Sequence, residues 1–456
     1  MTPTAPIRSY LTARDGGARL TIQPPHWPDA GEPDLPSVYV NTEHRFQTIE
    51  GFGGAFTEAA AVSWLTLDAA RREELLEACF ARDHGHGYSL CRVHMGSCDF
   101  ALGNYAHVET PEDMALASFS IERDRQALLP FIKAAQRVAG APIKLLASPW
   151  SPPAWMKTNG QMNGGGKLRD DCRRAWARCY ARFIEAYAAE GVPVWGVSVQ
   201  NEPMAVQRWD SCIYTAGEER DFVRDFLGPE LEAAGHGNVR IVIWDHNRDL
   251  MVERADTVYS DPEAARYVWG TGFHWYGEDR FDHVQQAHDA WPDKKLLFTE
   301  GCQEGGPHHG SWELGERYAR SMINDLNRWT VGWIDWNLLL DDRGGPNHVG
   351  NFCSAPILVD TSAGTFTPQS SYFYIGHFAR FVKSGAQRVL CASTTENIEA
   401  AGFINPDGSA AVVALNRSEQ TLRFALHISG SRTVTELPPR SIASYVVPEE
   451  TGTAPR

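Results

Sequence analysis

The stretch RRAWARCYARFIEAYAAEGVPVWGVSVQNEP, residues 173–203, contains a helix pattern followed by a strand pattern. In its first half, apolar side chains recur at spacings of three and four with arginines between them, as on an amphipathic helix. These side chains are Trp176, Cys179, Tyr180, Phe183, Ile184 and Tyr187. The run 194–200 is short and apolar, which is typical of a strand buried on both faces of a parallel sheet. The stretch therefore predicts one α/β repeat.

Runs of the same kind recur through the middle of the chain, with helix patterns between them. There are eight, at residues 48–52, 88–94, 143–148, 194–200, 240–245, 271–276, 295–299 and 332–338. Eight strand-and-helix repeats predict an α/β fold of the (β/α)8 TIM-barrel type, with long loops. A doubly wound open sheet is the alternative, but no glycine fingerprint for a dinucleotide follows any of the runs.

The two ends of the chain have a different pattern. Residues 388–447 alternate with period two between turn signals such as Asn405-Pro-Asp-Gly, which is typical of β-hairpins. Short strand candidates also lie near the N-terminus, at 19–22 and 37–40. Since barrel termini often lie close together, we predict an accessory all-β sandwich built from both terminal segments.

These patterns divide the chain into three segments. Residues 1–47 are expected to contribute strands to the sandwich, residues 48–384 to form the barrel, and residues 385–456 to complete the sandwich. The last residues, 449–456, are expected to be a frayed tail.

Composition excludes several classes of protein. The 42 basic and 57 acidic residues give a formal net charge of −15, which repels phosphate backbones, so we expect no nucleic-acid partner. No apolar run approaches the roughly 20 residues of a membrane span, so no stable membrane insertion is expected. The nine cysteines contain no CxxC pair, which favours neither a disulfide scaffold nor a zinc ribbon.

The first residues lack the apolar region of a signal peptide. This predicts a cytoplasmic location, with export by another route left open. The oligomeric state is left open as well.

Two carboxylates stand directly after apolar runs, where a TIM barrel builds its chemistry. Glu202 follows VSVQN and Glu300 follows LLFT, at the ends of the predicted fourth and seventh strands. A glutamate in such a place is costly unless it is paired or used. Glycoside hydrolysis requires two carboxylates, since one protonates the departing oxygen while the other attacks. The alternative from position alone is a pair of ion-paired rim glutamates.

Short motifs follow one another in order over about three quarters of the chain. They are GFGGAFTE at 51–58, RVHMGSCDF at 92–100, ASPWSPPAWMKTNG at 147–160, QNEP at 200–203, HWY at 274–276, TEGC at 299–302, DWNLLL at 335–340, GGPNHVGNF at 344–352 and GHFARFV at 376–382. On these motifs the sequence resembles glycoside hydrolase family 30, and within it the glucosylceramidase (acid β-glucosidase) branch.

The resemblance implies a retaining β-glycosidase that hydrolyses β-D-glucosides by double displacement, without a metal or cofactor. Glu202 would be the acid/base and Glu300 the nucleophile, with the charge of Glu300 keeping Glu202 protonated. Retention requires the two carboxyl groups to lie about 5–5.5 Å apart. The partner would be a carbohydrate or glycolipid substrate.

The resemblance also implies a sugar pocket. Asp99 would bind hydroxyls on the far side of the ring, with Arg92 nearby to position it. Asn201 would hold the 2-hydroxyl, and Tyr276 would hydrogen-bond the nucleophile. The remaining implied contacts are Trp150, Trp336, Asn351 and His274; for the tryptophans the alternative is core packing, and for Arg92 a structural ion pair.

The loops at the barrel mouth depart from the pattern of the lipid-cleaving enzymes. These loops, residues 204–215 and 303–312, would line the aglycone side, so the natural leaving group stays open. Alternatives within the family are an endo-β-1,6-glucanase, a β-xylosidase or a β-fucosidase; a non-catalytic carbohydrate-binding protein is a more remote one. Cys302 and Cys353 are interpreted as small buried cysteines, with a functional thiol as the alternative.

Overall fold

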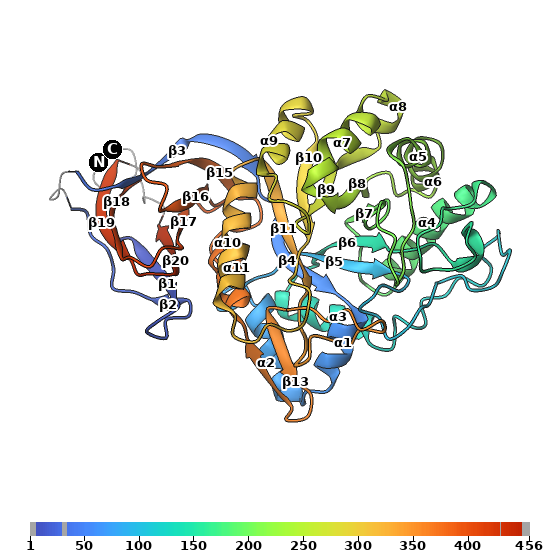
Figure 1. Cartoon of the computed structure of the whole chain (residues 1–456), viewed down its shortest axis with the longest axis horizontal. Coiled ribbons are helices and arrows are strands. Elements are labelled where there is room, and N and C mark those ends of the chain that lie inside the picture. The colour runs from blue at the N-terminus through green and yellow to red at the C-terminus, as the bar shows by residue number, and fades with distance from the viewer. Residues whose placement is uncertain (1–5, 30–33, 429, 449–456) are drawn as a thin grey trace, which may run out of the picture. The chain divides into compact units, whose positions relative to one another are not determined.

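The computed structural model describes residues 6–29, 34–428 and 430–448. They form two compact units (Figure 1), each described here by itself. The described parts of Met1–Phe52, Gly310–Gly332 and Pro368–Arg456 form one unit, and Gly53–His309 with Trp333–Thr367 form the other. The expected tail at 449–456 lies outside the described residues.

Eight parallel strands close into a barrel in the order β10-β11-β4-β5-β6-β7-β8-β9 (Figure 1). Their bounds are β4 Gly51–Phe56, β5 Leu90–Met95, β6 Lys144–Pro149, β7 Gly196–Ser198, β8 Arg240–Asn247, β9 Val268–His274, β10 Lys295–Glu300 and β11 Thr330–Asn337. Each of the eight predicted runs overlaps one of these strands, which confirms the (β/α)8 fold.

The first barrel strand starts later than the predicted run at 48–52. Thr48 is the last residue of β3 (Ser37–Thr48) and pairs with Gln387 in the sandwich, whereas β4 begins at Gly51. The chain is extended both before and after it passes from the sandwich strand to the barrel strand. An apolar pattern alone therefore does not mark the boundary between the two strands.

Helices follow the barrel strands as the repeat pattern predicts. Their bounds are α1 Glu58–Leu65, α2 Ala69–Phe80, α3 Leu128–Ala139, α4 Arg173–Ala189, α5 Ala216–Phe222, α6 Gly228–Ala233, α7 Met251–Tyr259, α8 Pro262–Ala265, α9 Phe281–Ala290, α10 Trp312–Leu326 and α11 Ser370–Ala379. The apolar stripe that predicted α4 is buried from Trp176 to Tyr187. Two threonines cap helices: Thr57, directly after β4, caps α1, and Thr215 forms a capping box with Glu218 at the start of α5.

Nine strands form the sandwich, in the hydrogen-bonded order β19-β18-β3-β15-β16-β17-β20-β1-β2. The strands not yet given are β1 Arg8–Ala13, β2 Thr21–Ile22, β15 Gln387–Ser393, β16 Glu399–Ile404, β17 Ala410–Asn416, β18 Leu422–Ile428, β19 Ser431–Leu437 and β20 Ser441–Val447. The first strand pairs with the last, so both chain ends build one sandwich, as predicted. Sequence reasoning missed β1, and the candidate at 19–22 is a strand only at Thr21–Ile22.

A short three-stranded sheet completes the secondary structure. Its strands are β12 Leu340–Asp341, β13 Ile357–Asp360 and β14 Thr365–Pro368. The predicted segment boundaries near residues 47 and 384 stay a prediction. In the contact pattern, α10 and α11 group with the sandwich rather than with the rest of the barrel segment.

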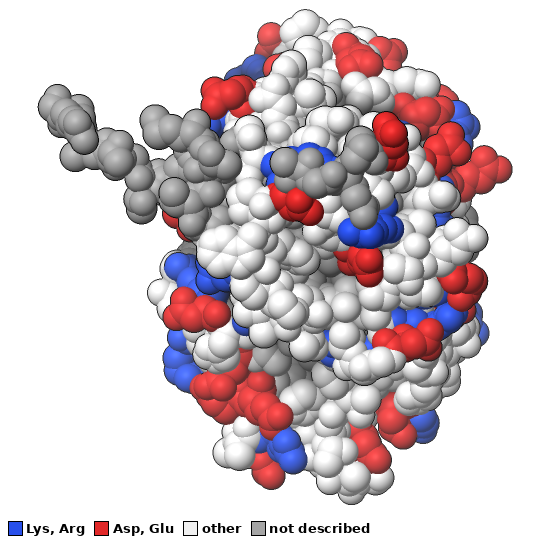
Figure 2. Space-filling view, turned by 90° about the vertical axis from the view of Figure 1, so that its left-hand side faces the viewer, with Lys and Arg blue, Asp and Glu red and all other residues white. Residues whose placement is uncertain are grey.

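Two properties bear on possible partners: the distribution of charged side chains on the surface and the apolar character of the helices. The face drawn in Figure 2 carries acidic and basic side chains interspersed in small groups. Among the described residues, no helix combines the length and the apolar character that crossing a membrane requires.

The sandwich core gives a test of the fold. Phe424 is completely buried in it, so Phe424→Ala should lower the free energy of unfolding by about 3–5 kcal/mol through lost burial and a cavity. Leu390→Ala, at a side chain that is 41% exposed on the same unit, should change it by less than about 0.5 kcal/mol. Urea denaturation followed by circular dichroism measures both, and equal losses would contradict the assigned core.

Candidate active site

A pocket opens at the C-terminal ends of the barrel strands, with about 540 Å³ of empty space. Eight predicted site residues line it: Asp99, Trp150, Asn201, Glu202, Tyr276, Glu300, Trp336 and Asn351. Two others, Arg92 and His274, have no exposed surface and are not among the lining residues. The structure thus brings the predicted site together, but gives these two a different place in it.

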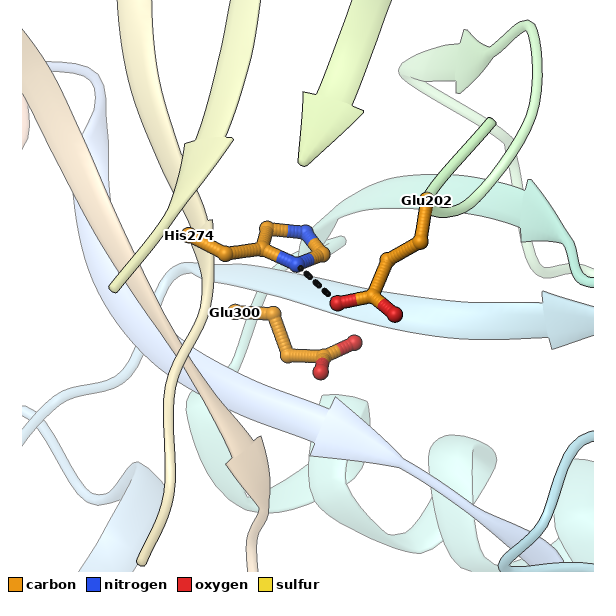
Figure 3. Close-up of side chains that lie close together, drawn as sticks. All are labelled: Glu202, His274 and Glu300. Atoms are coloured by element: carbon orange, nitrogen blue, oxygen red, sulfur yellow. Dashed lines mark hydrogen bonds and ion pairs between the residues drawn. The ribbon is translucent and has the colours of Figure 1, made fainter. Parts of the chain in front are cut away.

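Glu202 and Glu300 face each other across the pocket (Figure 3). A carboxylate oxygen of each, together with a ring nitrogen of His274, all lie within 4.8 Å of one another. Glu300 ends β10, and Glu202 stands in the loop after β7. Two carboxylates at this distance can act on the same small group from two sides.

Glu300 is held by two donors. Arg92 Nη1 donates to Oε2 at 2.6 Å and Tyr276 Oη donates to Oε1 at 2.8 Å, which confirms the expected contact of Tyr276. Burial raises the pKa of Glu300, while the charges of His274 and Arg92 and the tyrosine hydrogen bond oppose that rise. These donors stabilise the charged carboxylate that a nucleophile requires.

Arg92 does not position Asp99, contrary to expectation. Its four hydrogen bonds go to Glu300, to Asn201 Oδ1 at 2.8 Å, to Asp245 Oδ2 at 2.7 Å and to Ser148 Oγ at 2.9 Å. The alternative interpretation, a structural ion pair, describes it better. Arg92 is buried behind the pocket wall and donates to two residues that line the pocket, Asn201 and Glu300.

His274 connects two acidic groups behind the pocket wall. Its Nδ1 lies 3.2 Å from Glu202 Oε1 and its Nε2 lies 3.0 Å from Asp245 Oδ1. Burial alone would lower its pKa, but the charge of Glu300 and the bonds to Asp245 and Glu202 raise the pKa of His274 to about 9. Burial would raise the pKa of Glu202, but the hydrogen bond from His274 and the nearby imidazoles lower it.

The charge of Glu300 also raises the proton affinity of His274, which lies between Glu202 and Asp245. The expectation that this charge keeps Glu202 protonated stays a prediction. The 3.2 Å contact between His274 Nδ1 and Glu202 Oε1 couples the two side chains into one proton-binding unit.

A β-bulge in β8 positions three consecutive residues for the site. Trp244 and Asp245 have φ angles of +70° and +51°, and the register with β9 shifts between Trp244 and His246. In a regular strand neighbouring side chains point to opposite faces, whereas here Asp245 contacts Arg92 and His274 while His246 and Asn247 line the pocket. Such strain is characteristic of functional sites.

Sequence reasoning missed His246 and Asn247, the last two residues of β8, as lining groups. His246 Nδ1 lies 3.9 Å from Glu202 Oε1 and has no hydrogen-bond partner among the described residues. Strand alternation would have pointed His246 away from the pocket, so only the bulge reveals it. Gln207, Trp209 and Glu304 lie in the two loops expected at the mouth, and Cys302 and Cys353 line the pocket beside them.

The pocket wall around Asp99 combines polar side chains with two stacked aromatic rings. Asp99 Oδ2 accepts from Asn347 Nδ2 at 3.2 Å and from Asn351 Nδ2 at 3.3 Å. Burial and the charge of Glu300 raise the pKa of Asp99 to about 8. Trp150 and Trp336 stack with ring centroids 5.0 Å apart. This wall offers hydrogen bonds to hydroxyls beside flat apolar rings, as a sugar requires.

Glu202, His274 and Glu300 also have the spacing of metal ligands. Both ring nitrogens of His274 already face carboxylate oxygens, of Glu202 and Asp245, so binding a metal would break one of these contacts. The three groups fit proton transfer better than metal binding.

Comparisons with known proteins agree with this geometry. Residues 49–382 match the glycosyl hydrolase family 30 TIM-barrel domain and residues 385–445 match the family's beta sandwich domain. The lysosomal acid glucosylceramidase of Mus musculus is 39% identical over 402 residues, which cover 84% of this chain and 78% of the mouse protein.

Two solved structures are similar over nearly the whole chain. SrfJ from Salmonella typhimurium is 38% identical with a TM-score of 0.93, covering 98% of this chain and 100% of that one. An endo-β1,6-glucanase is 28% identical with a TM-score of 0.88, again covering 98% and 100%.

The tyrosine bond to Glu300 can be tested by titration. A hydrogen bond to a charged group contributes about 1.5–3 kcal/mol, or roughly one to two pKa units. Because Tyr276 favours the charged form, Tyr276→Phe should raise the pKa of Glu300 by about that amount. Carbon-13 NMR of the labelled carboxyl group measures the change.

The matched control is Tyr180→Phe, since the hydroxyl of Tyr180 is also buried but donates to Val199 O. That variant should leave the titration of Glu300 in place. The same titration in wild type and Tyr276→Phe would contradict the assigned support.

Proposed function

The chain belongs to glycosyl hydrolase family 30 and is a glycoside hydrolase, and from that premise we propose that it is a retaining, exo-acting β-glucosidase of the glucosylceramidase type. The observation that carries the proposal is the pair Glu202 and Glu300, whose carboxylate oxygens lie within 4.8 Å of each other. Arg92 contacts Glu300 and His274 contacts Glu202, so the two carboxylates have different surroundings. A short separation favours direct attack over the water-mediated route, which needs the carboxyl groups about 6.5–9.5 Å apart.

In the first step, a Glu300 oxygen bonds to the anomeric carbon as the bond to the aglycone oxygen breaks. Arg92 and Tyr276 hold the attacking carboxylate in place. Glu202 gives its proton to the departing oxygen and is left as a carboxylate that keeps its contact with His274 through Oε1. The contacts of Glu202 with His274 and His246 both involve Oε1, which leaves Oε2 for the leaving group.

In the second step, a water molecule attacks the glycosyl–Glu300 ester. Glu202, now without its proton, accepts one from this water, and Glu300 departs with its charge restored. Esterification removes the negative charge of Glu300, which is one of the groups that raise the pKa of His274. The Glu202–His274 unit thus binds its proton less tightly after each first step.

The sugar would lie against Asp99 and the two stacked tryptophans. Asn347 and Asn351 donate to Asp99 and hold its carboxylate in place for the hydroxyls of the sugar. Asn201 Oδ1 is occupied by Arg92, so its amide nitrogen is the atom available to the 2-hydroxyl. Gln207, Trp209, His246 and Asn247 would face the aglycone.

The nucleophile can be tested directly. Glu300→Gln should reduce hydrolysis of an aryl β-D-glucoside by a factor on the order of 10⁴ or more, as loss of a catalytic nucleophile does in other enzymes. In the wild type, proton NMR should show the β-anomer of glucose as the first product.

Glu304→Gln is the matched control, because Glu304 lines the same pocket but accepts from Asn351 instead of from Arg92 and Tyr276. Its loss should stay within about tenfold. The assignment fails if Glu300→Gln keeps its activity, and retention fails if α-glucose appears first.

An endo-β-1,6-glucanase is the second candidate, because such an enzyme is similar in structure over 98% of this chain. Rates on an aryl glucoside, glucosylceramide, β-1,6-glucan and an aryl xyloside separate the possibilities. We expect the glucosides to be preferred over the xyloside by up to about 10⁴-fold, since the xyloside lacks a hydroxyl group that the site would bind. Faster cleavage of long glucan chains than of aryl glucosides would favour the endo enzyme instead.

A further inference from the structure

Two thiols stand together in the wall of the pocket. Cys302 comes two residues after Glu300, and Cys353 comes two residues after Asn351. Both line the pocket, both are free, and they are 2% and 1% exposed. The glycosidase mechanism uses neither of them.

The backbone brings these thiols to one face. Glu304 forms an antiparallel bridge with Cys353, and Ser354 N donates to Gln303 O at 2.8 Å beside it. In such a pairing Cys302 is a diagonal neighbour of Cys353 on the same side. The two thiols are indeed hydrogen-bond partners, and both belong to the same buried cluster as Trp150 and Trp336.

Each thiol also touches a group that supports the pocket. Cys302 Sγ lies 3.5 Å from Tyr276 Oη, whose hydroxyl donates to Glu300. Cys353 Sγ donates to Asn351 O at 3.5 Å, and the side chain of Asn351 donates to Asp99. A group bound across the two sulfurs would therefore disturb the nucleophile's side and the sugar-binding side together.

The surroundings select the chemistry that can react there. The hydrogen bond with Cys353 and burial raise the pKa of Cys302, and burial raises the pKa of Cys353 although the bond with Cys302 opposes it. Little thiolate is therefore present, and reagents that need a single thiolate react slowly. A reagent that bonds two sulfurs at once gains from their contact. A monosubstituted trivalent arsenical does this: R–As=O and two thiols give R–As(SR′)₂ and one water, with no change of oxidation state.

We propose that Cys302 and Cys353 form a dithiol site for trivalent arsenicals, entered through the sugar pocket, and that its occupation blocks glycoside hydrolysis. The binding half of the proposal stands on the two thiols alone. The inhibition half rests on the proposed function.

The probe is phenylarsine oxide, added to the full-length protein. Intact-mass measurement should show one phenylarsenic group for each chain, mapped to the peptides of Cys302 and Cys353. Excess dithiothreitol should remove it, whereas a monothiol at the same thiol concentration should not. Hydrolysis of an aryl β-glucoside should fall at least tenfold in parallel and return with dithiothreitol.

Cys353→Ala and Cys302→Ala should each lose the adduct and become at least tenfold less sensitive, relative to their own untreated activity. Circular dichroism checks that both variants are folded, and Cys353→Val replaces Cys353→Ala if that variant is not. Cys79→Ala is the matched control, because Cys79 and Cys91 are another neighbouring buried pair that does not line the pocket. It should keep the full adduct and sensitivity.

An adduct that persists in Cys353→Ala, or one that maps to Cys79 and Cys91, overturns the proposed site. An adduct at Cys302 and Cys353 without loss of activity overturns the inhibition alone. If the untreated protein hydrolyses no glycoside while the adduct forms as expected, the proposed function fails and the dithiol site stands.

Discussion

Arg92 carries a positive charge with none of its surface exposed, and each hydrogen bond it makes ends on a residue of the site or its support. Taking such a charge out of water costs several kcal/mol unless opposite charges offset it. Asp245 and Glu300 provide that offset at 2.7 and 2.6 Å. The contact with Glu300 also fixes this carboxylate at the barrel mouth. The ion pair that offsets the burial of Arg92 therefore positions Glu300 as well.

The proton of the site follows from this arrangement. Asp245 is fully buried and remains charged, because Arg92, His274 and Ser198 together lower its pKa despite the cost of burial. It accepts from one ring nitrogen of His274 and leaves the other to face Glu202. A fully buried carboxylate thus orients the imidazole that contacts Glu202. The chain of contacts runs from Arg92 through Asp245 and His274 to Glu202.

Backbone strain is concentrated where these contacts need it. Glu202 has a φ of +46°, and Trp244 and Asp245 also lie in the left-handed region. The amide of Glu202 donates to Asp245 O at 3.0 Å, which joins the strained residues across two neighbouring strand ends. Non-glycine residues hold such conformations only when the surroundings compensate for the cost of about 1–3 kcal/mol each. The contacts of Asp245 with Arg92 and His274, and of Glu202 with His274, offset this cost.

The sequence by itself determined the barrel, the two-ended sandwich and the position of both glutamates at the barrel mouth. Apolar periodicity depends on neighbouring residues, and the motifs around Asp99, Glu202 and Glu300 are contiguous, so both can be read along the chain. Only the tertiary structure decided that Arg92 and His274 lie behind the pocket wall, that His246 lines it, and that Cys302 meets Cys353. The physical reason is that these outcomes depend on a bulge, on desolvation and on contacts between distant segments. None of those leaves a regular period in the order of the residues.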